Sequence, residues 1–278
     1  MASGTVVVTG SSTGIGHACA VALSAEGFHV LAGVRNETDG EALRDAGAEP
    51  VIVDVTDATT IDALAERIQE EHDGRLAGLV NNAGISVAGP LEGLPIDEWR
   101  RQFEVNVFGQ VAVTKALLPA LRAAKGRIAF MSSVGGKSAI PLLGPYGASK
   151  HAIEAVGDSL RQEMEPFGVD VAIIEPGSVQ TPIWDKGLAE AATVRAALGD
   201  EVNRLYGDRL DAMAALAEKT GAAGVPPAEV AKAVTHALTA DRPKTRYVVG
   251  REARAQLTAN AILPDRAFDR LVARLMRG

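Results

Sequence analysis

The sequence predicts an α/β fold in which a doubly wound parallel sheet lies between two layers of helices, α/β/α, within a single domain of 278 residues. Three observations predict it. Strand-like and helix-like segments alternate along the chain, a glycine-rich turn follows the first strand, and polar residues follow the ends of later strands. Because ligands of such sheets bind beyond the carboxyl ends of the strands, these polar residues should lie close to one another.

The first strand, glycine turn and helix form a candidate phosphate site. Thr5–Val8 is a short β-branched run, typical of a strand that is buried on both faces. Glycines 10, 14 and 16 follow, and a helix is predicted from about Ile15 to Glu26. Glycine lets the backbone approach a pyrophosphate, and the helix N-terminus directs free N–H groups at an anion. A glycine-rich turn could be only a turn, but its position after the first strand favours dinucleotide binding.

The other elements continue the alternation, which implies a parallel sheet with helices on both faces. Further strands are predicted at Phe28–Val34, Pro50–Val53, Leu76–Val80, Arg127–Met131, Asp170–Ile174 and Tyr247–Val249. Further helices are predicted at Glu37–Ala46, Ala58–Glu71, Ile96–Asn106, Val107–Ala124, Tyr146–Phe167 and Pro227–Thr239. Polar residues follow the third, fourth and fifth strands: Asp54, Asn81 and Ser133.

Composition narrows the class of protein. An apolar content of 47% suffices for a sizeable core, and a net charge of −7 argues against nucleic-acid binding. No apolar run approaches the ~18 residues of a membrane span, and the N-terminus lacks the layout of a signal peptide. The single cysteine, Cys19, fits a reducing compartment, so we expect a cytoplasmic protein. The five histidines lack metal-ligand spacing, so we expect no metal.

Tyr146 and Lys150 are four residues apart on a predicted helix and therefore share one face. A nearby ammonium favours the phenolate form of tyrosine, and Lys150 together with a positively charged nicotinamide in a desolvated cleft could lower the pKa of Tyr146 toward neutrality. Such a tyrosine could take or give the proton of a hydroxyl or carbonyl group. Taken alone, this spacing could also be a surface pair on an amphipathic helix. The glycine turn upstream favours proton transfer.

Together these features resemble the short-chain dehydrogenase/reductase family over residues 5 to about 250. The motifs that carry the resemblance are Thr9–Gly16, Asn81–Gly84, Asn106, Ser133, Tyr146 with Lys150, and Pro176-Gly177. The resemblance implies a Rossmann-like domain, and hydride transfer between NAD or NADP and a secondary alcohol or ketone.

The resemblance also implies roles for four residues. Tyr146 is the general acid/base, Ser133 hydrogen-bonds the substrate oxygen, and Lys150 binds the nicotinamide ribose and lowers the pKa of the tyrosine. Asn106 holds a backbone kink and a water of the proton relay. Ser133 is preferred because it lies thirteen residues before Tyr146, the family's usual gap. The alternative serines are Ser132 and Ser138.

Coenzyme contacts are implied at the loops that follow the strands, in addition to Tyr146 and Lys150. These residues are Gly10, Ser12, Thr13, Gly14, Ile15, Gly16, Arg35, Asp54, Val55, Asn82, Ala83, Gly84, Pro176, Gly177, Val179 and Thr181. Asp54 is expected at the adenine amino group and Thr181 at the nicotinamide amide. Either residue could instead cap a helix.

The end of the second strand favours NADP(H) over NAD(H). An NAD-specific site places a carboxylate there for the ribose hydroxyls, but this chain has Val34. Arg35 follows, and its guanidinium could bind a 2′-phosphate with two hydrogen bonds. Alternatively, Arg35 stacks on the adenine and leaves NAD acceptable.

Residues 183–225 form an apolar insertion with helical spacing, which in the family is the substrate lid. A long apolar lid resembles the hydroxysteroid and retinol dehydrogenase branch, so we expect a bulky steroid-, retinoid- or terpenoid-like substrate. The expected pocket residues are Ile140, Leu142, Ile183 and Trp184. The insertion could instead be a packed helical hairpin without a part in catalysis.

Residues 251–278 form a C-terminal helical extension. Its last helix has an apolar face and a basic face, the latter from Arg266, Arg270, Arg274 and Arg277. The basic face could rest on an anionic membrane surface, but we favour a helix that packs on the protein with its basic face in water.

Two other functions are compatible with this fold. One is a dinucleotide-binding redox sensor without turnover, which typically lacks the tyrosine. The other is an epimerase or dehydratase, whose chains are usually longer and have a different glycine spacing. The resemblance also implies a homodimer or homotetramer, assembled on the helices around 107–124 and 146–167.

Overall fold

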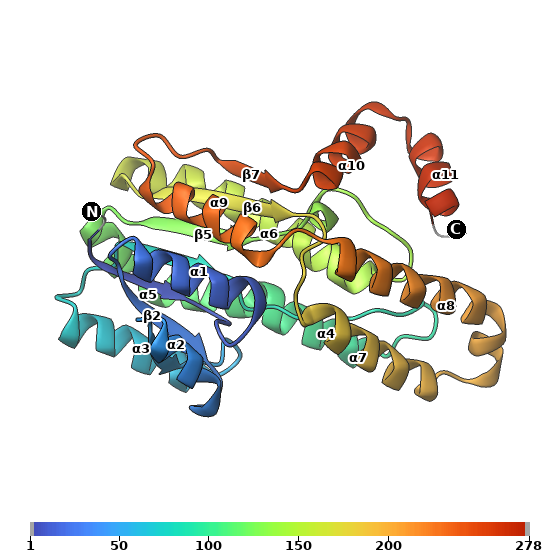
Figure 1. Cartoon of the computed structure of the whole chain (residues 1–278), viewed down its shortest axis with the longest axis horizontal. Coiled ribbons are helices and arrows are strands. Elements are labelled where there is room, and N and C mark those ends of the chain that lie inside the picture. Colours follow the sequence, from blue (N-terminus) through green and yellow to red (C-terminus); the bar gives the residue numbers. More distant parts are fainter. Residues whose placement is uncertain (1–2, 276–278) are drawn as a thin grey trace.

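The computed structural model describes residues 3–275 and confirms the predicted α/β fold (Figure 1). Seven parallel strands form one sheet in the order β3-β2-β1-β4-β5-β6-β7. The strands are β1 (Thr5–Val8), β2 (His29–Val34), β3 (Glu49–Ile52), β4 (Gly78–Asn81), β5 (Arg127–Met131), β6 (Asp170–Pro176) and β7 (Arg246–Val249). The strand order reverses between β1 and β4, which is the position where doubly wound sheets bind ligands.

Helices cover both faces of this sheet. One face is covered by α1 (Gly14–Ala25), α2 (Glu41–Asp45) and α9 (Pro227–Thr239), and the other by α3 (Ala58–Glu71), α5 (Gln110–Ala124) and α6 (Gly144–Met164). The remaining helices lie toward the carboxyl ends of the strands (Figure 1): α4 (Ile96–Phe103), α7 (Ile183–Ala197), α8 (Asp200–Ala223), α10 (Arg251–Ile262) and α11 (Asp265–Leu275). None of the described helices is both long enough and apolar enough to cross a membrane.

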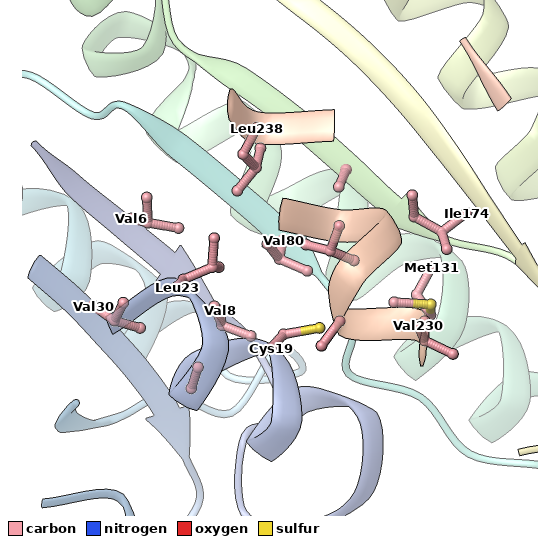
Figure 2. Close-up of a cluster of buried hydrophobic side chains, with 14 of the residues drawn as sticks. Val6, Val8, Cys19, Leu23, Val30, Val80, Met131, Ile174, Val230 and Leu238 are labelled. Carbon is pink, nitrogen blue, oxygen red and sulfur yellow. The ribbon is translucent and has the colours of Figure 1, made fainter. Parts of the chain in front are cut away.

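The core has two parts because the central strands bury both faces. Val6 and Val8 point to the layer formed by α1 and α9, whereas Val7 points to the layer of α3 and α5. Each fully buried valine of this kind contributes roughly 1.5–3 kcal/mol. Figure 2 shows Cys19 among the apolar side chains of the first layer. Cys19 is therefore a core residue, and its burial raises the pKa of the thiol to about 12.

Three predicted helices differ from the structure. The predicted helix Glu37–Ala46 is a 3-10 turn at Thr38–Gly40 followed by the short α2. The cause is local, because the Asn36 side chain accepts a hydrogen bond from the Asp39 backbone N–H at 2.9 Å and favours a turn. The predicted helices from 96 to 124 are joined without a loop by a π-helical turn, Glu104–Gly109, which contains Asn106.

Candidate active site

The glycine turn after β1 forms a cradle that larger residues would fill. Gly10 and Gly14 have φ angles of +67° and +60°, in the left-handed region that favours glycine. A Cβ atom at Gly10 would lie 2.8 Å from the Ala83 Cα atom. A Cβ atom at Gly16 would overlap the carbonyl oxygen of Gly10 and lie 2.5 Å from Asn82 Nδ2. The turn therefore brings the backbone of α1 against the loop after β4.

The N-terminus of α1 suits an anionic group. The Thr13 side chain, at the N-cap, makes no capping hydrogen bond, and the first turn of the helix contains no acidic residue. The free N–H groups of this turn are therefore available to a pyrophosphate. Together with the glycine cradle, this arrangement fits the dinucleotide that the sequence predicts.

Thr9, which the predicted site does not include, ties this cradle to the loop after β4. Its hydroxyl oxygen accepts hydrogen bonds from the backbone N–H groups of Asn82 at 3.0 Å and Ala83 at 3.1 Å. In return, Asn82 Nδ2 donates to the carbonyl oxygens of Thr9 and Gly10, both at 3.0 Å. These contacts hold the predicted coenzyme residues Asn82 and Ala83 beside Gly10.

The structure brings Ser133, Tyr146 and Lys150 together at the carboxyl end of β5. Ser133 follows that strand and accepts a hydrogen bond from the backbone N–H of Gly135 at 3.1 Å. The Lys150 ammonium lies 5.7 Å from the centre of the Tyr146 ring and donates to the Met131 carbonyl oxygen at 2.7 Å. Ser133, in the loop after β5, and Tyr146 and Lys150 of α6 therefore lie at the same carboxyl edge of the sheet as the glycine cradle.

The pKa of Tyr146 differs from the sequence-based expectation. Lys150 was expected to lower it, but burial of the phenol raises the pKa of Tyr146, and a hydrogen bond with Ser133 opposes that shift. Burial likewise lowers the pKa of Lys150 to about 8, and the neighbouring Glu154 opposes this shift. The cause is desolvation, which disfavours the charged form of both groups.

The two alternative serines face elsewhere. Ser138 Oγ donates to the Val134 carbonyl oxygen at 3.2 Å and accepts from Gln256 Nε2 at 2.7 Å. Ser132 Oγ is buried beside Gly136 and has no hydrogen-bond partner among residues 3–275. Of the three serines, Ser133 is the one whose hydroxyl contacts Tyr146.

Asn106 lies in the π-helical turn, and its side chain pairs with the loop that follows β4. Its Oδ1 accepts from the Ile85 N–H at 2.8 Å, and its Nδ2 donates to the Ile85 carbonyl oxygen at 3.0 Å. The Nδ2 atom also approaches Ser149 Oγ at 3.4 Å.

Sequence reasoning missed two other amides on this face of the helix. Gln102 accepts from the Val87 N–H at 2.7 Å and donates to the Ile85 carbonyl oxygen at 3.0 Å. Gln110 donates to the Ala83 carbonyl oxygen at 3.2 Å. Both are fully buried, as is Asn106. The available signal was their spacing, since residues 102, 106 and 110 follow one another at four-residue intervals.

The predicted adenosine residues lie at the ends of β2 and β3. Asp54 Oδ1 accepts from Thr56, at 2.9 Å from its N–H and 2.7 Å from its hydroxyl, whereas the N-cap of α3 is Asp57. Asp54 is therefore not the helix cap. Val55 is buried against Gly109, and Arg35 is exposed directly after β2.

The loop after β6 closes the site from the other side. Gly177 donates its N–H to the Val249 carbonyl oxygen at 3.0 Å and packs against Ala253 of α10. A Cβ atom at Gly14 would lie 3.1 Å from Thr181 Cγ2, so Thr181 borders the glycine cradle.

The predicted pocket residues occupy different positions. Trp184 donates its indole N–H to the Val179 carbonyl oxygen at 2.7 Å and packs against Gly221 of α8. It therefore joins the start of α7 to the end of α8. Ile183 is exposed at the start of α7. Ile140 and Leu142 are partly buried in the loop before α6, where Leu142 has a φ angle of +66°.

The C-terminal extension consists of two helices. Residues Gln256 and Asn260 of α10 hydrogen-bond Ser138 and the Lys137 carbonyl oxygen, at 2.7 and 2.9 Å, so this helix supports the loop after Ser133. Phe268 of α11 is buried, while Arg266, Arg270 and Arg274 are exposed. Arg277, which was assigned to the basic face, lies outside the described residues.

Within residues 3–275 no three His, Cys, Asp or Glu side chains gather closely enough to hold a metal ion.

Comparison with known proteins gives consistent matches. The short chain dehydrogenase family matches residues 4–192. An NADPH-dependent 3-dehydrocapnine reductase of Ornithobacterium rhinotracheale is 35% identical over 274 residues, covering 95% of this chain and 94% of that protein. Retinol dehydrogenase 5 of Mus musculus is 34% identical over 275 residues, covering 95% and 86%. The crystal structure of a short chain dehydrogenase from Burkholderia cenocepacia J2315 in complex with NADP superposes with a TM-score of 0.74 at 25% identity, covering 98% and 97%.

Proposed function

This chain belongs to the short-chain dehydrogenase/reductase family, and from that premise we propose that it transfers a hydride between NADP(H) and a secondary alcohol or ketone of a bulky apolar substrate. Action on CH–OH or C=O groups with NAD(P) follows from membership of the family. The preference for NADP(H), the class of substrate and the roles of individual residues are the proposed part.

In this proposal the coenzyme lies along the carboxyl ends of the strands and supplies or accepts the hydride. The N–H groups of α1 and the glycine cradle bind its pyrophosphate. Asp54 and Val55 border the adenine, and Thr181 orients the nicotinamide amide. The unused N-terminus of α1 and the cradle that a Cβ atom would fill support this placement.

Arg35 is proposed to bind the 2′-phosphate of NADP. It is exposed after β2, and none of the ion pairs formed by residues 3–275 involves it. The preceding residue is the buried Val34, so no carboxylate stands at the position that would repel a phosphate. The NADPH-dependent relative and the NADP-bound structure also support this preference.

Tyr146 is proposed to exchange a proton with the substrate oxygen while Ser133 hydrogen-bonds the same oxygen. Reduction of a ketone then takes the phenolic proton, and oxidation of an alcohol returns it. Lys150 acts as an ammonium beside the phenol, because a positive charge favours the phenolate that remains after proton donation. The contact between Ser133 and Tyr146, with Lys150 5.7 Å from the ring centre, supports these roles.

The apolar substrate is proposed to bind under α7 and α8. These helices lie against the loop before α4: Cβ atoms at Gly89 and Gly93 would contact Val194, Leu198 and Val202. Such a cover excludes water from the reacting groups and presents apolar side chains to a ligand. One of the relatives is named for retinol, which supports this class of substrate.

A homodimer or homotetramer is also proposed, with contacts on the outer faces of α5 and α6. Phe108 and Val111 are large apolar side chains at the start of this surface, and they are 58% and 36% exposed. Exposed apolar residues gathered in this way mark protein contacts.

The convergence of Ser133, Tyr146 and Lys150 beside the glycine cradle is the observation that carries the proposal. The test is a screen of apolar ketones with NADPH or NADH, and of secondary alcohols with NADP or NAD, following the absorbance of the reduced nicotinamide. We expect turnover of at least one bulky apolar compound, with Tyr146→Phe as the inactive control. Coenzyme binding without turnover of any compound would indicate a redox sensor, and a preference for small polar alcohols would contradict the apolar substrate.

A further inference from the structure

Two carboxyl groups are buried next to each other, one of them a helical turn from Lys150. Glu154 follows Lys150 by four residues on α6, so both side chains lie on one face of the helix, and Glu154 is 4% exposed. Glu175 is 2% exposed on β6, the residue before the Pro176-Gly177 motif. Buried carboxylates are costly unless they are paired, so their partners indicate what they do.

The two carboxyl groups have unequal partners. Glu154 Oε2 receives Lys137 Nζ at 2.8 Å and two nitrogens of Arg246, Nη2 at 3.0 Å and Nε at 3.1 Å. Glu175 has one charged contact, between its Oε1 and Arg246 Nε at 3.2 Å. Glu175 therefore has less opposite charge beside it than Glu154, which favours its protonated form.

The remaining oxygens of the pair point to a shared proton. In the part of the chain that the structure describes, Glu154 Oε1 makes no hydrogen bond, and the contact of Glu175 Oε1 with Arg246 Nε is an ion pair that lacks hydrogen-bond geometry. A proton on one carboxyl group would satisfy an oxygen of the other. Burial, followed by the charge of Glu154, raises the pKa of Glu175 to about 7, so near neutrality the pair holds one proton for part of the time.

Five other charged side chains surround the carboxyl pair. They are Lys150, Asp158 and Arg161 on α6, Lys137 in the loop before α6, and Arg246 on β7. Asp158 accepts from Arg246 Nη2 at 2.7 Å and lies one turn beyond Glu154. Glu154 is therefore the carboxylate between this cluster and Lys150.

We propose that Glu154 is a positioning residue whose carboxylate keeps Lys150 in its ammonium form, while Glu175 carries the proton of the carboxyl pair. The inference rests on the proposed function, in which Lys150 acts as a cation. The ammonium is buried, and its hydrogen bond to the neutral Met131 carbonyl oxygen adds no opposite charge. Arg246 and Lys137 in turn form ion pairs with Glu154, so β7 and the loop before α6 both contribute to the charges around Lys150.

The test replaces Glu154 with glutamine, which keeps the shape and removes the charge. The coenzyme dissociation constant is measured by calorimetry across pH, together with kcat/KM once a substrate is known. In the wild type we expect binding to weaken as the pH rises through the pKa of Lys150, about 8. In Glu154→Gln we expect this weakening about one pH unit lower, because a neighbouring opposite charge no longer raises the lysine pKa.

A matched variant separates charge from structure. Asp158→Asn also removes a partner of Arg246 but leaves Glu154 in place. We expect it to leave the pH at which coenzyme binding weakens, the basic limb, where it is in the wild type. The proposal would be overturned if the pH at which coenzyme binding weakens were the same in Glu154→Gln as in the wild type, or if Asp158→Asn shifted it equally.

A folding readout covers the case in which Glu154→Gln is too unstable to titrate. If the defect is an uncompensated Lys150 ammonium, the double variant Glu154→Gln with Lys150→Met should unfold at a higher temperature than the single variant. A double variant no more stable than the single one would then overturn the proposal. Because calorimetry and unfolding need no turnover, they test Glu154 even if the substrate screen fails.

Discussion

The Asn106 side chain pairs with both backbone groups of Ile85, accepting from its N–H at 2.8 Å and donating to its carbonyl oxygen at 3.0 Å. Ile85 follows Asn82–Gly84, the loop that borders the glycine cradle. The Asn106 amide therefore holds this loop against the π-helical turn that precedes α5.

Asn106→Leu should lose both stability and activity. Leucine has a similar size, but it leaves the Ile85 N–H without its partner and removes one of the two donors to the Ile85 carbonyl oxygen. The unpaired N–H costs about 1–3 kcal/mol if it stays buried. Urea unfolding and kcat/KM measure the two effects. Gln102→Met is the matched control, because it removes the other donor to the same carbonyl group one turn earlier. If Asn106→Leu retained wild-type kcat/KM, Asn106 would have no part in arranging the site.

Tyr146→Phe should reduce turnover by roughly 10²–10⁴-fold, the usual contribution of a general acid/base. Only the phenolic oxygen is lost, so the helix and the coenzyme site should persist. Circular dichroism and calorimetric coenzyme binding check that they do. Activity within about tenfold of the wild type would rule out Tyr146 as the proton donor.

The sheet could be predicted because its strands are marked locally. Runs such as Thr5–Val8 and Arg127–Met131 are short, largely apolar and followed by polar or glycine residues, and each became a strand at the predicted position. The parallel order then follows from the helices between strands. For the same reason the residues at strand ends, such as Asn82 and Ser133, could be placed near one another before the structure was known.

The remaining features depend on contacts between distant segments. The buried carboxyl pair joins α6 to β6 and is held by Arg246 from β7, so no local pattern shows that Glu154 is buried. The roles of Gln102 and Gln110 depend on a loop some twenty residues earlier. The sequence shows the spacing of Tyr146 to Lys150 but not how far the phenol is desolvated, which raises the pKa of Tyr146 in this structure.

The lid should become more ordered when substrate binds. Besides the apolar packing on Gly89 and Gly93, two polar contacts join it to the loop and helix below it, Arg101 to Glu190 at 3.0 Å and Tyr206 to Glu92 at 2.9 Å. Both polar contacts lie on the surface, where such contacts contribute little, so we expect α7 and α8 to open without ligand. Hydrogen exchange of residues 183–225 should slow when NADP and a bulky ketone bind. Unchanged exchange with a confirmed substrate would contradict a lid function.

Phe108→Glu should disrupt the proposed assembly. A charge at this exposed position would have to be buried in a contact between subunits, which is unfavourable without a partner. Light scattering at micromolar concentration should show a dimer or tetramer for the wild type and a smaller species for the variant. Ile52→Glu is the control, since Ile52 is 45% exposed on β3 at the far edge of the sheet. A monomeric wild type would remove the basis of this prediction.

Arg35→Ala should abolish the preference for NADP. A guanidinium bound to a phosphate makes charge-assisted hydrogen bonds of about 1.5–3 kcal/mol, so kcat/KM for NADP should fall roughly tenfold to a hundredfold. The value for NAD should change little, because its ribose carries no phosphate at that position. Arg44→Ala removes the same charge from the exposed face of α2 and should affect neither coenzyme. If Arg35→Ala lowered kcat/KM equally for both coenzymes, Arg35 would instead stack on the adenine, which NAD and NADP share.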